Sequence, residues 1–178
     1  MCIRDRRTID YEVGATRDVW QEAAKPVGYG IAGYLALLLL IQGLAWPMAM
    51  EEMSDYCPEN SANCVYSSQT KSYRTELPSL RFNASIDSVM NAVIQWEDSL
   101  WFSSIQSSDQ SFIHIVHRTP LMQFPDDVFI TLTCTNGMVE VSFQSQSRLG
   151  AGDLNKNPER FADFHEHMLN SSFQDSCI

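Results

Sequence analysis

Basic residues are scarce in this chain and unevenly placed. Its 178 residues include 12 lysines and arginines against 22 aspartates and glutamates, which gives a net charge of −10 at pH 7. Residues 1–50 hold equal numbers of both signs, so all of the negative charge lies in residues 51–178. A domain of that charge repels phosphate backbones and anionic lipid headgroups. The composition argues against nucleic acid as a partner and against docking on an anionic lipid surface.

Motifs of familiar enzyme chemistry are also missing. The sequence has no Gly-x-Ser-x-Gly turn and no phosphate-binding glycine loop, because Gly150-Ala-Gly152 is too short for one. His165 and His167 are two residues apart on an expected helix, so their side chains point to different sides. The cysteine spacing does not form a zinc motif. We therefore predict no metal and no cofactor, and assign no catalytic residue.

No charged residue occurs between Lys25 and Glu51. The stretch 27–49 supplies the ~20 apolar residues that a helix needs to cross a bilayer. Basic residues precede it and acidic residues follow it, which predicts a cytoplasmic N-terminus and an exported part, residues 51–178. We expect a single-pass anchor in an inner (cytoplasmic) membrane, with residues 51–178 in the periplasm or an equivalent exported compartment. A cleaved signal peptide and a buried core helix are the alternatives.

The expected organisation is a cytoplasmic segment (1–26), a transmembrane helix (27–49), a connector loop (50–71) and an α+β domain (72–178). The connector lacks hydrophobic periodicity and contains Cys57 and Cys64. In an oxidising compartment these two could form a disulfide, and Cys134 and Cys177 could tie the tail to the sheet. Buried free thiols are the alternative.

The domain is predicted to be an antiparallel sheet of about five strands with two helices packed on one face. Ser85 is a good N-cap, and the apolar residues after it repeat at helical spacing. The second helix is expected to have Asn157 as its N-cap and Pro158 as its first residue. The expected elements, in order, are strand 77–82, helix 85–97, strands 100–105, 112–118, 128–134 and 138–147, and the helix from 157.

Asn136-Gly137 is the strongest hairpin signal in the chain, because a type I′ turn requires positive φ at both positions. A two-residue turn fixes the register, so Asp127 is expected opposite Gln146. Asp127 and Arg148 then become diagonal neighbours on one face of the sheet.

The stretch 145–160 contains a strand end, a glycine-containing loop and a helix start. We expect one end of the hairpin to gather the candidate binding residues, which are Asp126, Asp127, Ser147, Arg148, Gly150, Asp153 and Asn157. One interpretation is a structural lock, in which Asp127 pairs with Arg148 and Asp153 accepts backbone N–H groups. The others are a small polar-ligand or cation site and a catalytic acid/base pair.

A set of motifs across residues 57–170 resembles a family of unknown function, the domain-of-unknown-function family 1499. These motifs are Cys57-Pro58, Asn63-Cys64-Val65, Ser67-Ser68, Phe124-x-Asp126-Asp127-Val128 and Ser145-x-Ser147-Arg148-x-Gly150-x-x-Asp153-Leu154-x-x-Asn157. The resemblance implies one domain with a shared site but supplies no reaction. This chain departs from it at Gln144, where the family usually has arginine, and at Asn155-Lys156, where it often has Gly-Val.

The leading hypothesis is a membrane-anchored envelope protein whose exported domain binds a partner protein or small ligand at the loop rim around Arg148. By analogy with helix-grip folds, a cavity between helix and sheet could hold a lipid-like ligand. The first alternative is an envelope hydrolase that uses Asp126, Asp127 or Asp153 as acid or base. The second is a structural subunit of a membrane complex.

Overall fold

The computed structural model describes residues 6–177, with side chains from residue 24 onward. Residues 1–5 of the expected cytoplasmic segment, and Ile178, lie outside the described residues. The chain divides into two units, one ending at Leu40 and the other comprising Ile41–Ile178. Each unit is described by itself.

The N-terminal element is one continuous helix, α1 (Arg6–Ala45), followed by a 3-10 turn, η1 (Trp46–Met48). The helix starts at Arg6, well before residue 27, and continues through Pro26, which lies inside it. Its part from Ala24, together with η1, is long and apolar enough to cross a membrane. Leu35 and Leu39 are more than half exposed, so this is not a core helix. A membrane span and a signal sequence both fit these properties.

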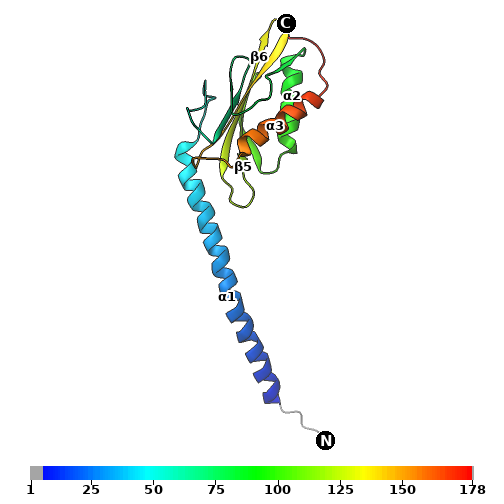
Figure 1. Cartoon of the computed structure of the whole chain (residues 1–178). Coiled ribbons are helices and arrows are strands. Elements are labelled where there is room, and N and C mark those ends of the chain that lie inside the picture. Colours follow the sequence, from blue (N-terminus) through cyan, green and yellow to red (C-terminus); the bar gives the residue numbers. More distant parts are fainter. Residues whose placement is uncertain (1–5, 178) are drawn as a thin grey trace. The chain divides into compact units, whose positions relative to one another are not determined.

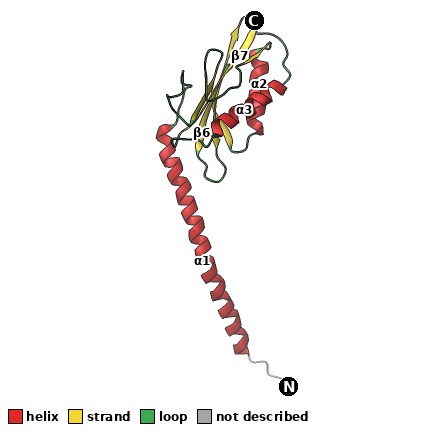
Figure 2. Cartoon of the chain, in the orientation of Figure 1, coloured by secondary structure: helices red, strands yellow, loops and turns green. Residues whose placement is uncertain are grey.

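The second unit is an α+β domain, as predicted (Figures 1 and 2). Its sheet has seven strands rather than about five. Two helices accompany the sheet, α2 (Ile86–Ser99) and α3 (Lys156–Asn170). The strands are β1 (Cys64–Ser67), β2 (Ser72–Tyr73), β3 (Leu80–Phe82), β4 (Ser103–Ser108), β5 (Phe112–Arg118), β6 (Pro125–Thr135) and β7 (Met138–Ser147).

All strand pairs are antiparallel, in the order β2-β1-β7-β6-β5-β4, with β3 also paired to β7. The strand β1 corrects the prediction that residues 50–71 form only a loop. Residues 64–67 form a strand because β3 covers only the first part of β7. The backbone of Phe143–Gln146 then needs another hydrogen-bond partner, which β1 supplies.

The hairpin of β6 and β7 has the predicted register, with Asp127 opposite Gln146. Asn136 and Gly137 both have positive φ, 53° and 77°, as the type I′ turn requires. Alternate side chains of the hairpin therefore face α2 and α3, and the others face away from these helices. We call these the helix face and the outer face of the sheet.

The core lies between the helix face and the two helices (Figure 2). At its centre Trp96 of α2 and Phe164 of α3 are in edge-to-face contact, and both pack near Phe143 of β7. Ser85 caps α2 as predicted, since its side chain accepts a hydrogen bond from the N–H of Ser88. This packing fixes α3 against the end of β7.

Three local predictions need correction. β4 begins at Ser103 rather than at residue 100, because α2 continues to Ser99 and Phe102 then takes a positive φ. The helix α3 begins one residue before Asn157, which is therefore not its N-cap. The N-cap is Asn155, with φ of 67°, and the side chain that accepts N–H groups there is Asp153.

Candidate functional site

The adjacent carboxylates at the start of β6 point to opposite faces of the sheet, because successive side chains of a strand alternate. Asp126 is on the helix face and bonds to Arg160 of α3. Asp127 is on the outer face and bonds to Arg148, just beyond β7. The two carboxylates therefore belong to two separate clusters.

On the outer face Asp127 is the centre of a buried cluster. Its oxygens accept hydrogen bonds from Nε and Nη2 of Arg148 (2.8 and 2.6 Å), from Nε2 of His114 (2.8 Å) and from the N–H of Met50 (3.3 Å). Burial acts to raise the pKa of Asp127. The hydrogen bonds from His114 and Arg148 and the arginine charge outweigh this, so the pKa lies below its usual 3.8.

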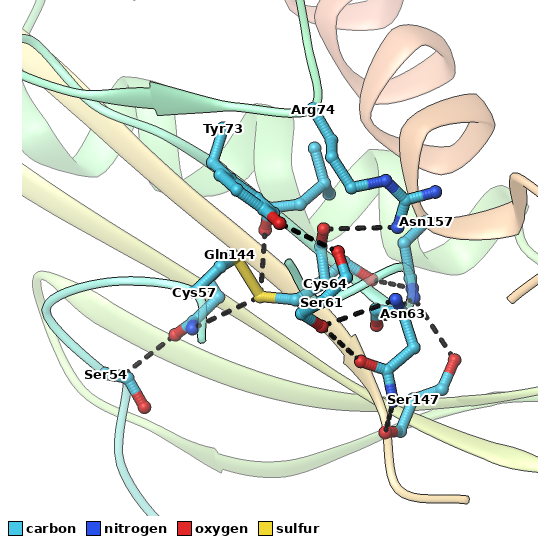
Figure 3. Close-up of a disulfide and its surroundings, with 12 residues drawn as sticks. Ser54, Cys57, Ser61, Asn63, Cys64, Tyr73, Arg74, Gln144, Ser147 and Asn157 are labelled. Carbon is cyan, nitrogen blue, oxygen red and sulfur yellow. Dashed lines mark hydrogen bonds between the residues drawn. A yellow bond between two sulfur atoms is a disulfide. The ribbon is translucent and has the colours of Figure 1, made fainter. Parts of the chain in front are cut away.

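Beside this cluster, the disulfide between Cys57 and Cys64 contacts Gln144, as Figure 3 shows. Gln144 is fully buried, and its side-chain oxygen accepts a 2.8 Å hydrogen bond from the N–H of Ser54. This glutamine therefore fixes the connector on the outer face. The structure also has the second pair considered from the sequence, Cys134–Cys177.

On the helix face Arg160 is the centre of a second buried cluster. Its Nη1 donates to Oγ of Ser145 (2.7 Å) and to Oδ1 of Asn157 (2.5 Å). Its Nη2 donates to Oδ2 of Asp126 (2.7 Å) and to Nδ1 of His117 (3.0 Å). Only 7% of the Arg160 side chain and 3% of the Asp126 side chain are exposed, so this is a desolvated ion pair.

The loop between β7 and α3 is held by Asp153. Arg74 donates to both of its oxygens, from Nη2 to Oδ1 (3.1 Å) and from Nη1 to Oδ2 (3.4 Å). The N–H groups of Asn155 and Asn157 donate to the same carboxylate, each at 3.0 Å. Burial acts to raise the pKa of Asp153, but Arg74 and these backbone donors hold it below 3.8.

Asn63 links this loop to the segment before β1 (Figure 3). Its amide nitrogen donates to the carbonyl oxygens of Ser147 (3.3 Å) and Gly150 (2.8 Å). Asn157 completes the link, since its amide donates to the carbonyl of Asn63 (2.8 Å) and to Oγ of Ser147 (3.1 Å). Each of the three candidate carboxylates is thus held by a different arginine, an arrangement that orders loops.

An apolar cavity of about 470 Å³ lies next to the Arg160 cluster. One wall comes from the loop between β5 and β6, and the other from residues 149–154. The apolar lining residues are Pro120, Met122, Phe124, Leu149 and Leu154. The partly buried His117 and the buried Asp126 and Arg160 also line it, as do the polar residues Thr119, Ser147, Asp153 and Lys156. Its size falls within the ~300–1,000 Å³ typical of small-molecule sites.

His117 presents a hydrogen-bond donor to this cavity. Because Arg160 donates to its Nδ1, the proton of the neutral ring must be on Nε2. Burial, and then the charge of Arg160, lower the pKa of His117 from 6.5 to about 4, so the ring is neutral at pH 7. The ring is only partly buried and Nε2 is not among the buried atoms without a partner, so this N–H is free to donate to water or to a ligand. The cavity therefore combines a largely apolar wall with the N–H donor of His117.

A second hollow, of about 620 Å³, lies at the outer face and includes Trp46, His114 and Arg148 in its lining. Asp127 already neutralises Arg148, and Glu51 adds a further negative charge to the same lining. An anion gains little there because Arg148, the cation among the described lining residues, is already paired with Asp127. The apolar cavity is the better candidate for a ligand.

The pKa of His117 predicts a loss of stability in mild acid. Between pH 6.5 and about 4 the unfolded chain binds a proton at this residue and the folded chain does not, so the free energy of unfolding falls as the pH falls. Because the ring is partly solvated, we expect the free energy of unfolding to fall by about 1–2 kcal/mol over this interval. Urea unfolding of the full chain at pH 7.5 and 4.5 measures it.

The matched control for this prediction is His117→Gln, because glutamine can still accept from Arg160 and donate to the cavity but does not titrate. This variant should lose less stability than the wild type over the same pH interval. Equal losses in the two proteins would contradict the assignment to His117.

Of the residues expected to converge, the structure separates Asp127 and Arg148 from the others. Asp126, Ser147, Gly150 and Asp153 all line the apolar cavity, whereas Asp127 and Arg148 are on the outer face. Asn157 lies behind the cavity and bonds to Ser145 and Ser147.

Sequence reasoning did not single out Arg74, His114 or His117 as partners of these residues. Arg74 is 79 positions from Asp153, and no local pattern joins them. The position of His117 opposite Asp126 was a usable signal, but it required the register of β5 against β6. Among the described residues, no three His, Cys, Asp or Glu side chains form a group that could hold a metal ion.

A search of curated proteins finds no match to the chain. A family comparison does find one: residues 56–168 match the family described as protein of unknown function (DUF1499). The match covers more than half of the chain and includes Asp126, Asp127, Arg148, Asp153 and Arg160. The chain therefore belongs to the DUF1499 family.

Proposed function

We propose that this protein is a membrane-anchored envelope module that binds a small ligand in the apolar cavity beside the loop after Arg148. The ligand has an apolar body and one hydrogen-bond acceptor. The observation that carries the proposal is the Nε2–H of His117, a donor of fixed tautomer on a residue that lines a largely apolar cavity.

In this proposal the anchor holds the domain outside the cytoplasm. The apolar part of the N-terminal helix supports membrane insertion, and the charge distribution around it supports a cytoplasmic N-terminus. Two disulfides between residues 57 and 177 suit an oxidising compartment, such as the periplasm or an equivalent exported space.

Binding is favoured over hydrolysis because each candidate acid or base is already engaged. Asp126, Asp127 and Asp153 are each paired with an arginine, and the pKa values of Asp127 and Asp153 are lowered, not raised. A general acid at neutral pH needs a raised carboxyl pKa. Asp126 and Asp153 instead hold the residues that line the cavity, and Asp127 holds the cluster on the outer face.

Titration of methyl hexanoate into the full chain in lipid nanodiscs tests the proposal, with leucine methyl groups observed by NMR. The Leu149 and Leu154 resonances should shift saturably, whereas Leu169, an exposed residue of α3 that does not line the cavity, should not. The His117→Phe variant should bind the ester about three- to tenfold more weakly, since it lacks the N–H donor.

Two comparisons separate the hydrogen bond from general apolar binding. His117→Gln keeps a donor and should bind the ester nearly as well as the wild type. Hexane, which has no acceptor, should bind the wild type and His117→Phe equally. The proposal fails if no saturable shift occurs at Leu149 and Leu154, or if His117→Phe leaves ester binding unchanged.

A further inference from the structure

Two uncharged loops flank the apolar cavity, residues 119–124 and 149–152. Leu121 of the first loop is 76% exposed, and Leu154, just after the second, is 92% exposed. Both leucines also have positive φ, 65° and 51°, a conformation that suits glycine or asparagine. Each leucine therefore has two unfavourable features: an apolar side chain exposed to water and a strained backbone. Such outliers point to function.

The loop 119–124 is tied to the end of the apolar helix. The side-chain nitrogen of Gln42 donates a 2.8 Å hydrogen bond to the carbonyl of Gln123. Gln42 lies within the apolar stretch, close to its end at Met48. Trp46 in the same stretch is 81% exposed, and tryptophan favours the membrane–water interface. The loop therefore lies beside Gln42 and near Trp46, residues expected at the interface of any bilayer that the helix crosses.

We propose that the cavity takes one acyl chain of a neutral or zwitterionic lipid from the bilayer that the helix crosses. The chain enters between Leu121 and Leu154, and an ester carbonyl oxygen of the lipid accepts the hydrogen bond from Nε2 of His117. This inference rests on the proposed function and names the ligand class and its source. The charge of residues 51–178 disfavours anionic lipid.

Burial of these two leucine side chains in the membrane interface is what would hold the loops there. Full burial of one leucine side chain contributes about 10- to 100-fold to partitioning out of water. Asparagine in their place removes this contribution and tolerates positive φ, so it relieves the strain at both positions. The double variant Leu121→Asn/Leu154→Asn is therefore expected to fold as stably as the wild type while its loops leave the interface.

The test is photo-crosslinking of the full chain in phosphatidylcholine nanodiscs. A small fraction of the lipid carries a photoactivatable diazirine at the end of one acyl chain, and mass spectrometry of peptides locates the adducts. We expect adducts on residues 119–124 and 147–154 in addition to those on the anchor helix, which serve as the internal standard. In the double variant the ratio of cavity to anchor adducts should fall by about tenfold or more. Leu169→Asn, which changes an exposed leucine outside the cavity, should leave the ratio unchanged.

The two proposals fail in distinguishable ways. If adducts are confined to the anchor while methyl hexanoate still shifts Leu149 and Leu154, the cavity binds a soluble ligand and the lipid inference is overturned. If neither probe reaches the cavity, the proposed function fails as well. Undiminished cavity adducts in the folded double variant would also overturn entry between the two leucines.

Discussion

Replacing Asp127 with alanine is expected to destabilise the folded domain by about 3–5 kcal/mol, the cost of removing one partner from a buried ion pair. The side chain of Asp127 is fully buried, and that of Arg148 is only 13% exposed. Without the carboxylate, Arg148 and the N–H groups of His114 and Met50 lose their acceptor. Each is left as a desolvated donor, which is more costly than a missing hydrogen bond at the surface.

Chemical unfolding of the full chain in mild detergent measures this loss. Arg148→Ala should cost a similar amount, and the double variant should cost clearly less than the sum, since the two residues act on each other. The surface pair Lys156–Glu159 provides the control, because both side chains are more than half exposed. Glu159→Ala should change the free energy of unfolding by no more than about 0.5 kcal/mol.

The pH dependence gives an independent check on Asp127. A carboxylate whose folded pKa lies below 3.8 stabilises the fold at pH values above 3.8, and this stabilisation is lost as the pH falls through the folded pKa. The difference between the wild type and Asp127→Ala should therefore be constant near neutrality and narrow below pH 3.8. If the difference in the free energy of unfolding narrows already between pH 7 and 5, a titrating group other than Asp127 is responsible for it.

The sequence was sufficient to predict the hairpin of β6 and β7, and with it the pairing of Asp127 and Arg148. Asn136-Gly137 specifies one turn type, and a two-residue turn leaves only one register. The side chains of β6 and β7 then alternate without a bulge up to the site. Local chemistry determined this geometry, so local reasoning could find it.

Long-range pairing explains what the sequence did not reveal. The four residues of β1 are too short to show a period, and their partner in β7 is about 80 positions away. The bond between Arg74 and Asp153 spans a similar separation. The start of α3 was misplaced because Asn157 has the right chemistry for an N-cap, whereas Asp153 accepts the N–H groups from outside the helix.

The same argument explains why the expected convergence of Asp126 and Asp127 was only partly right. Strand alternation places them on opposite faces, but which face receives a helix depends on the packing of α3. Once Arg160 of α3 meets Asp126, the helix face acquires a buried charge next to the cavity. The outer face instead receives the connector, through Met50 and Ser54.

Replacing Arg160 with methionine is expected to cost about 3–5 kcal/mol, because it leaves Asp126, 3% exposed, without a charge partner. Ser145 and Asn157 also lose a donor in this variant. The double variant Asp126→Leu/Arg160→Met should recover most of that loss, since well-packed apolar residues can replace a buried ion pair at little cost.

The double variant also separates the shape of the cavity from its polarity. Its fold should be close to that of the wild type, so the loops that line the cavity should persist. His117 would then lack the Arg160 donor that fixes its tautomer, and its pKa would no longer be lowered by the arginine charge. Ester binding should weaken while hexane binding stays the same. If Arg160→Met alone costs less than about 1 kcal/mol, the cluster does not hold the cavity in shape, and selection of the ligand by His117 would need another explanation.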